Sequence, residues 1–137
     1  MAMTKRPILL VEDDLVDVRT VQRAFKELRV TNRLDTAGNG EEALAFLRDL
    51  RHERPSLILL DLNMPRMNGV EFLRIVKQDD TLKTIPVVVL TTSREEQDVV
   101  DSFRLSVAGY MIKPVDYRQF VEVVRTIQLY WTVSETP

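Results

Sequence analysis

The chain has 137 residues, of which 45% are hydrophobic, so it is long enough for one domain with a single buried core. It contains no cysteine, which excludes disulfides and thiolate metal sites. The net charge of -2 argues against a nucleic-acid-binding surface. Its apolar runs are too short to cross a bilayer and no signal peptide precedes them, so we expect a cytoplasmic protein without a membrane partner.

The first predicted strand is Ile8–Val11, a continuous β-favouring run typical of a strand covered on both faces. Apolar residues then recur at helical spacing over residues 15–30, which predicts a helix with Asp14 as its N-cap. Glu12 and Asp13 lie between this strand and the cap. Three adjacent acids can also be the solvated start of a helix, so these residues alone leave both interpretations open.

The alternation of strand and helix continues along the rest of the chain. Further strands are predicted over residues 34–37, 57–60, 85–90 and 109–112, the one at 34–37 being the least distinct. Helices are predicted to follow them, two with Asn39 and Asn68 as their N-caps, one over residues 94–105 and one beginning near residue 116. Five repeats of this order predict a doubly wound α/β fold, with a five-stranded parallel sheet between two layers of helices.

Polar residues follow most of the predicted strands, at the edge of the sheet where such folds bind ligands. They are Glu12 and Asp13 after the first strand, Asp61 after the third, Thr91 after the fourth and Lys113 after the fifth. Carboxylates gathered in one cleft repel each other unless cations offset their charge. Oxygen donors without histidine or cysteine favour Mg²⁺ over zinc, and phosphate commonly takes an open position on Mg²⁺. The simpler alternative is that Asp61 only caps the next turn.

With these residues in place, the chain resembles the receiver domain of response regulators in two-component signalling. The acidic pair, the strand-end Asp61, Thr91 and the Lys113-Pro114 step carry this resemblance. The Val-Glu-Asp-Asp start, the Asp-Leu-Asn-Met-Pro turn, the Val-Val-Leu-Thr-Thr-Ser segment and the aromatic tail resemble single-domain regulators partnered with bacterial phytochrome histidine kinases. The resemblance implies a flavodoxin-like receiver fold with strand order 2-1-3-4-5 and five helices.

The resemblance also implies a role for each acidic residue. Asp61 would accept a phosphoryl group from a phosphohistidine of the kinase, forming an acyl phosphate. Glu12 and Asp13 would hold Mg²⁺ as the cofactor, with Asp61 and the backbone carbonyl of Asn63 as further ligands. Many receivers have aspartate where this chain has Glu12, and the longer side chain would suit contact with the metal through a water molecule.

Four further residues complete the implied site. Lys113 would contact the phosphoryl oxygens, and the peptide bond between Lys113 and Pro114 is expected to be cis, which aims the lysine inward. Thr91 would bond a phosphoryl oxygen and move toward it. Tyr110 matches the aromatic switch position, which turns inward when Thr91 vacates its space. Without these partners, Tyr110 would be an ordinary half-buried strand tyrosine.

We expect residues 1–137 to form a single receiver domain with an extended aromatic C-terminal helix and no output domain. The signal would then be a surface change read by an unknown downstream protein. Apolar residues cover about half of the last helix, more than the roughly 100° needed to face one core. This favours a homodimer through the fourth helix, fifth strand and fifth helix, although a well-buried helix is the alternative. The expected interface residues are Val121, Val124, Tyr130 and Trp131.

Two other function classes compete with this interpretation. A phosphatase of the haloacid dehalogenase type also uses a strand-end aspartate with Mg²⁺, but it needs a second aspartate where this chain has Asn63. A pseudo-receiver would be only a scaffold, against which the intact Asp61, Thr91 and Lys113 argue. The favoured protein is not an enzyme acting on other substrates, although it would catalyse its own phosphorylation and dephosphorylation.

Overall fold

The computed structural model describes residues 6–27, 29–62, 64, 67–91, 94–112, 118, 119, 122 and 125. Strands and helices alternate along this part of the chain, as predicted. Their bounds are β1 Ile8–Val11, α1 Leu15–Glu27, β2 Leu34–Ala37, α2 Gly40–Arg48, β3 Leu57–Asp61, α3 Gly69–Gln78, β4 Val87–Thr91, α4 Arg94–Ser102 and β5 Gly109–Ile112. The fifth helix predicted near residue 116 falls largely outside the described residues.

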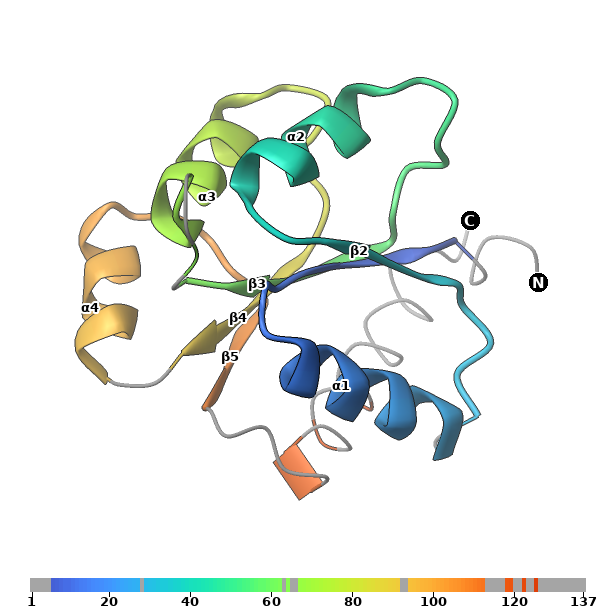
Figure 1. Ribbon diagram of the computed structural model, residues 1–137. Helices are drawn as coiled ribbons and strands as arrows, with labels where there is room; N and C mark the ends of the chain where they lie inside the picture. Colours follow the sequence, from blue (N-terminus) through green and yellow to red (C-terminus); the bar gives the residue numbers. More distant parts are fainter. Residues whose placement is uncertain are drawn as a thin grey trace.

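The five strands form one parallel sheet in the order β2-β1-β3-β4-β5, which confirms the predicted fold class and strand order. Figure 1 shows α2 and α3 on one face of this sheet and α1 on the other, with α4 beside β4 and β5. Crossover helices on both faces bury the central strands, which explains why β1 and β3 consist almost entirely of apolar residues. All five carboxyl ends therefore meet at one edge.

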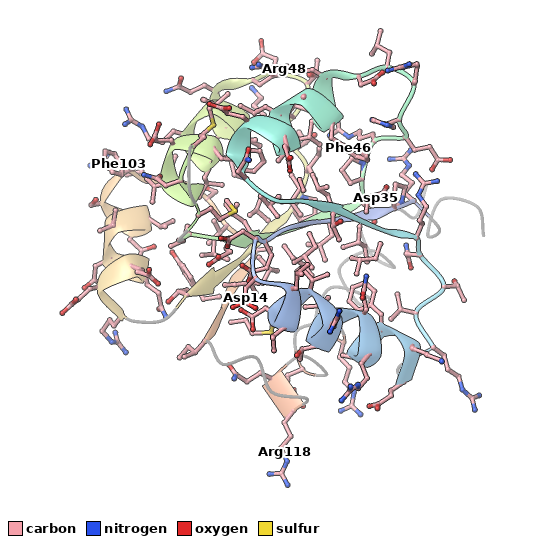
Figure 2. The ribbon with its side chains drawn as sticks, in the orientation of Figure 1. Asp14, Asp35, Phe46, Arg48, Phe103 and Arg118 are labelled. Carbon is pink, nitrogen blue, oxygen red and sulfur yellow. The ribbon has the colours of Figure 1, made fainter. Side chains whose placement is uncertain are left out.

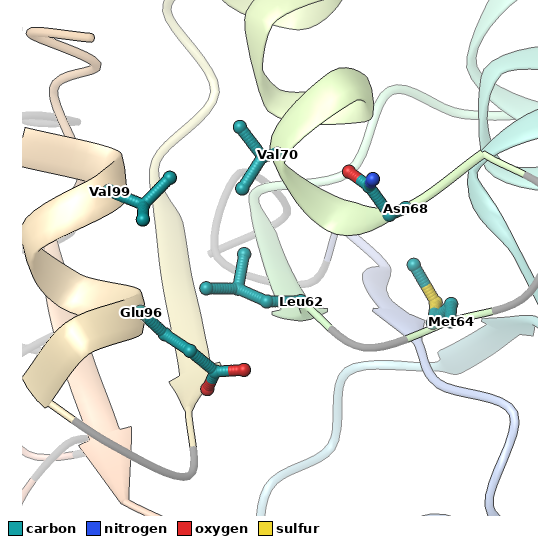
Figure 3. A pocket seen from close by; sticks show the side chains of 6 residues that line it. All are labelled: Leu62, Met64, Asn68, Val70, Glu96 and Val99. Carbon is teal, nitrogen blue, oxygen red and sulfur yellow. The ribbon is translucent and has the colours of Figure 1, made fainter. Parts of the chain in front are cut away.

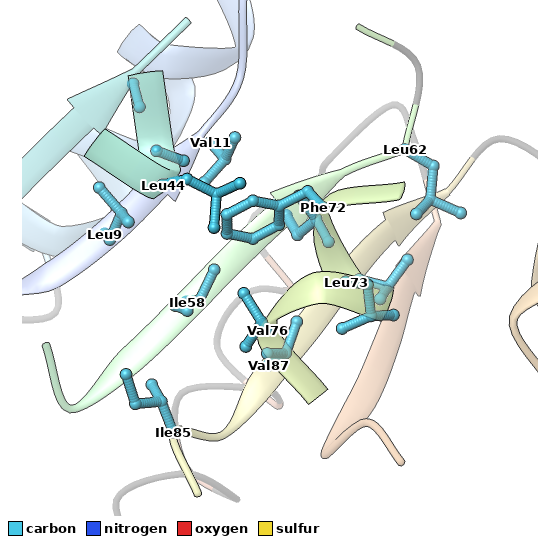
Figure 4. Close-up of a cluster of buried hydrophobic side chains, with 14 of the residues drawn as sticks. Leu9, Val11, Leu44, Ile58, Leu62, Phe72, Leu73, Val76, Ile85 and Val87 are labelled. Carbon is cyan, nitrogen blue, oxygen red and sulfur yellow. The ribbon is translucent and has the colours of Figure 1, made fainter. Parts of the chain in front are cut away.

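Successive side chains of each strand feed two separate cores, because they point to opposite faces of the sheet. Leu9 and Val11 of β1 join the core beneath α2 and α3, where Phe72 is fully buried (Figure 4). Ile8 and Leu10 join the core beneath α1. The two cores together hold the strand ends in fixed relative positions.

Two helices begin at the asparagine caps that the sequence predicts. The side chain of Asn39 accepts a hydrogen bond of 2.9 Å from the backbone N–H of Glu42 at the start of α2. Asn68 accepts one of 3.0 Å from the backbone N–H of Glu71 at the start of α3. These bonds satisfy backbone donors that a helix start leaves without partners, so both starts are fixed locally by sequence.

Two helices end earlier than their apolar patterns predict, and the same turn ends both. α1 was expected to reach residue 30 and α4 to reach residue 105. Arg29 and Arg104 instead adopt the left-handed conformation, with φ of 57° and 55°. The backbone N–H of Val30 then bonds to the Phe25 carbonyl at 2.9 Å, and that of Leu105 bonds to the carbonyl five residues before it at 3.4 Å. Such turns usually contain glycine or asparagine, so the arginines did not indicate in the sequence that the helices end there.

Candidate functional site

The predicted acidic site lies where β1 and β3 end side by side. Val11 pairs with Leu60 in the parallel register, so the next residues, Glu12 and Asp61, are neighbours at the sheet edge. The backbone N–H of Glu12 bonds to the carbonyl of Ala37 at 2.9 Å, which extends the β1 ladder beyond the strand. The sheet itself therefore positions both carboxylates.

Glu12, Asp13 and Asp61 form one cluster, in which a carboxylate oxygen of each residue lies within 4.8 Å of the others. Glu12 and Asp61 are buried, with 3% and 2% of their surface exposed, whereas Asp13 is exposed. Buried carboxylates this close repel one another strongly in a medium of low dielectric constant. A hard divalent cation with oxygen ligands would offset that repulsion, so the donor set fits Mg²⁺.

Asp14 does not belong to this cluster, although it directly follows Asp13. Its carboxylate caps α1, accepting hydrogen bonds of 2.8 Å from the backbone N–H of Val16 and 3.3 Å from that of Asp17. Figure 2 shows Asp14 at the start of α1, below the sheet edge. Of the three adjacent acids, two thus join Asp61 and one serves the helix, as the sequence predicts.

Two glycines make close backbone contacts with Leu62 and Met67, which follow Asp61 in the chain. The backbone N–H of Gly69 donates to the carbonyl of Leu62 at 3.0 Å, and a Cβ at Gly69 would lie 2.6 Å from the Asp61 carbonyl oxygen. The N–H of Gly40 donates to the carbonyl of Met67 at 3.2 Å, where a Cβ would come within 2.8 Å of that oxygen. A larger residue at Gly69 or Gly40 would push Leu62 or Met67 away, so these close approaches require glycine.

Thr91 and Tyr110 lie on the neighbouring strands β4 and β5. Thr91 is the last residue of β4, next to β3, and it is fully buried. Tyr110 lies on β5 and is half-buried, and its hydroxyl donates a hydrogen bond of 2.8 Å to Asp101 of α4. Burial, and then this bond to Asp101, raise the pKa of Tyr110 to about 12. The sequence pointed to Tyr110 but not to its partner Asp101.

A cavity of about 240 Å³ opens beside Leu62 and Met64, between the start of α3 and α4 (Figure 3). Its walls are mostly apolar, and Glu96 and Asn68 are its polar members. Leu62, directly after Asp61, lines it together with Val99 of α4. The cavity therefore lies between Leu62, which follows Asp61, and the fourth helix.

The remaining predicted site residues lie outside the described residues. They are Asn63, Lys113, Pro114, Val121, Val124, Tyr130 and Trp131. Their suggested contacts with metal, phosphoryl group or partner subunit stay predictions.

Among the helices within the described ranges, none has the length and apolar character needed to cross a membrane.

The family model for the response regulator receiver domain matches residues 8–125. The chain belongs to the response-regulator receiver family. The match spans all five strands and the acidic edge, and it favours the receiver over the phosphatase interpretation.

Receivers from phytochrome systems are among the most similar proteins. Response regulator Rcp1 of Synechocystis sp. is 41% identical over 133 residues, covering 94% of this chain and 90% of Rcp1. The Mn²⁺-bound structure of Rcp1 has a TM-score of 0.76 at 42% identity, over 93% of this chain and 94% of that chain. Phosphorylated RcpA, a cyanobacterial phytochrome response regulator, has a TM-score of 0.78 at 41% identity, covering 96% of both chains. The bacteriophytochrome response regulator RtBRR reaches 0.81 at 40% identity, over 88% of this receiver and 76% of that chain.

Proposed function

We propose that this receiver is a stand-alone response regulator that takes a phosphoryl group from a histidine kinase onto Asp61. The observation that carries the proposal is the position of the Asp61 carboxylate, which lies at the end of β3 within 4.8 Å of two further carboxylates. A lone acid at a strand end could cap a turn, but a three-carboxylate cluster with Mg²⁺-type donors suits phosphoryl chemistry.

The proposed reaction is a phosphoryl transfer between two side chains. An oxygen of the ionised Asp61 attacks the phosphorus of the phosphohistidine, a P–O bond forms, and the P–N bond breaks. The electron pair of the broken bond returns to the imidazole, which leaves as a neutral ring or takes up a proton. Water later attacks the acyl phosphate and releases inorganic phosphate, so the regulator returns to its first state without turning over another substrate.

The charge of the three carboxylates is the main obstacle to this reaction. Glu12, Asp13 and Asp61, with the carbonyl of Asn63, would hold Mg²⁺. Bound Mg²⁺ would neutralise charge on the carboxylates and on the phosphoryl oxygens. Lys113 would contact those oxygens from the fifth strand, and the Thr91 hydroxyl would donate to one of them. The similar structure of Rcp1 is a Mn²⁺-bound form, which supports a divalent cation as the cofactor.

The proposals for the kinase partner and for the output rest on the similarity to phytochrome response regulators. We propose a histidine kinase of the bacterial phytochrome type as phosphodonor, since three similar proteins are named as phytochrome or bacteriophytochrome response regulators. We propose that the transfer takes place in the cytoplasm. Residues 1–137 would act as a single receiver domain, as the 90% coverage of Rcp1 supports. Phosphorylation would change the surface formed by α4, β5 and the last helix, which an unidentified downstream protein would read.

Acetyl phosphate tests the phosphoacceptor directly, because it donates a phosphoryl group without a kinase. Wild type incubated with acetyl phosphate and Mg²⁺ should gain one labile phosphoryl group by intact mass, and chelation of the metal should abolish the gain. Asp61→Asn should gain none, while the matched control Asp14→Asn, which removes a neighbouring acid outside the cluster, should react like wild type. An adduct retained in Asp61→Asn would overturn the proposal.

The proposed homodimer needs a separate test, because it concerns residues beyond those described. Its interface would include Val121, Val124, Tyr130 and Trp131. Mass in solution should show a dimer for wild type and a monomer for Trp131→Glu, since a buried carboxylate would oppose association. An unchanged monomer in both would overturn the dimer while leaving the phosphoacceptor proposal intact.

A further inference from the structure

One hydrogen bond joins α4 to the fifth strand, next to the predicted switch. The hydroxyl of Tyr110 donates to a carboxylate oxygen of Asp101 at 2.8 Å. Asp101 lies in the last turn of α4 and Tyr110 is the second residue of β5. We propose that Asp101 is a positioning residue that holds the Tyr110 ring against α4 in the resting protein. It would thereby set how readily this receiver responds to a phosphoryl group, and in this respect the inference rests on the proposed function.

The bond matters because α4 buries little apolar surface within the part of the chain that the structure describes. Val100 is the only buried residue in this helix of nine residues. Val99 remains 43% exposed, and Phe103, just beyond the helix, remains 46% exposed. The Arg74 guanidinium lies 4.7 Å from the centre of the Phe103 ring and provides a second contact, toward α3. A helix with one buried side chain depends on such individual polar contacts more than a well-packed helix does.

The register of β4 and β5 places the Tyr110 ring on the same face of the sheet as Thr91, so the ring has a second position available beside Thr91. Tyr110 pairs with Val89, and Ile112 pairs with Thr91. Since side chains alternate across a strand, Val89 and Thr91 share one face of the sheet. Val89 belongs to the core beneath α2, α3 and α4, and Tyr110 packs against the same core. Tyr110 and Thr91 therefore lie on the same face, toward α4, and Asp101 competes with the Thr91 end for the phenol.

The charges around the phenol keep it a donor. Asp101 accepts its proton in a hydrogen bond, and Asp98, one turn earlier on α4, adds a second negative charge nearby. Both favour the neutral phenol over the phenolate, which would be repelled by the carboxylates. At neutral pH the bond is therefore charge-assisted, the stronger class of protein hydrogen bond. Its loss should shift the balance between the two ring positions by at least about threefold.

The test follows the Tyr110 ring by fluorine NMR in protein labelled with 3-fluorotyrosine, with Tyr110→Phe used to assign its signal among the three tyrosines. Beryllofluoride with Mg²⁺ serves as the probe, because it mimics a phosphoryl group on a carboxylate. Wild type should show one main signal that beryllofluoride moves to a second position. Asp101→Ala should show the second signal at least threefold more populated without beryllofluoride, and it should need about threefold less beryllofluoride for half-saturation.

The matched control is Asp98→Ala, which removes the same charge from the same helix without removing the hydrogen bond to Tyr110. It should keep the wild-type signal, and Asp101→Asn should restore it in part because an amide oxygen still accepts a hydrogen bond. The inference is overturned if Asp101→Ala and Asp98→Ala give the same spectrum without beryllofluoride. Failure of wild type to bind beryllofluoride would instead count against the proposed function, while the spectra without the probe would still decide the role of Asp101.

Discussion

The part of the molecule around β1 and β3, its well-packed side, is held more firmly than the part around α4 and the edge strand β5, its weakly held side. Every residue of β1 and β3 is buried, and these strands end in the acidic cluster. By contrast, β5 has a single buried residue, Met111, and α4 has only Val100. The carboxylates proposed to bind Mg²⁺ and the phosphoryl group are therefore fixed by two hydrophobic cores. The elements proposed to respond to phosphorylation, α4 and β5, are held by a few contacts. Weakly packed elements are those that can move at low cost.

The largest expected effect comes from the well-packed side. Phe72 of α3 is fully buried, so Phe72→Ala should lower the free energy of unfolding by about 3–5 kcal/mol. Phe103 beside α4 is half exposed and contacts Arg74, so Phe103→Ala should cost less than about 1 kcal/mol. Denaturant unfolding of both variants measures the contrast. Equal losses would mean that α4 is held as firmly as α3.

A second pair of variants compares glycines on the two sides. A Cβ at Gly69 would meet the backbone of Leu62 at 2.5 Å, whereas nothing lies within 4 Å of a Cβ at Gly109 on β5. Gly69→Ala should cost about 1–3 kcal/mol through overpacking, and it should also slow phosphorylation because the loop after Asp61 must shift. Gly109→Ala should change stability by less than about 0.5 kcal/mol. A large loss in Gly109→Ala, measured by the same unfolding curves, would contradict the comparison.

Metal binding should strengthen only the acidic side. Mg²⁺ at ten times its dissociation constant should stabilise the protein by about 1.4 kcal/mol, seen as a higher unfolding temperature. Asp13→Asn should abolish this gain, because it removes an exposed member of the cluster. Asp14→Asn serves as the control, since it weakens the cap of α1 but should keep the response to Mg²⁺. If Mg²⁺ stabilised Asp13→Asn as much as wild type, the metal would not be bound by this cluster.

The smallest effect concerns pH on the weakly held side. Folding raises the pKa of Tyr110 from 10.0 to about 12, so the folded state favours the protonated phenol. This contribution is fully present below pH 10.0 and is lost as the pH rises through about 12. The stability difference between wild type and Tyr110→Phe should therefore shrink over that range in unfolding experiments. A constant difference would show that the hydroxyl has the same environment in both states.

Much of the fold could be predicted because its signals are local. The apolar runs of β1 and β3 and the caps Asn39 and Asn68 each reflect neighbouring residues, and the structure confirms them. The grouping of Glu12, Asp13 and Asp61 followed from topology, since parallel strands end at one edge. Local pattern and topology therefore sufficed for the acidic cluster.

The rest depends on contacts between distant segments. The bond between Asp101 and Tyr110 gave no signal, because an aspartate on an exposed acidic helix is ordinarily solvated and only the packing of α4 on β5 brings the pair together. The close approach of Gly40 to Met67 likewise joins α2 to the loop after Asp61. The early ends of α1 and α4 were missed since arginine is rarely left-handed.

Those two left-handed arginines have a consequence for engineering. An L-residue in this conformation costs about 1–2 kcal/mol relative to a right-handed one, a cost that glycine does not carry. The receiver thus has an untapped reserve of stability at the ends of α1 and α4. Arg29→Gly, just after α1, should therefore raise the free energy of unfolding without changing α4 or β5. Arg104→Gly should raise it as well, and because Arg104 lies three residues after Asp101 this change would also affect the role that we propose for Asp101.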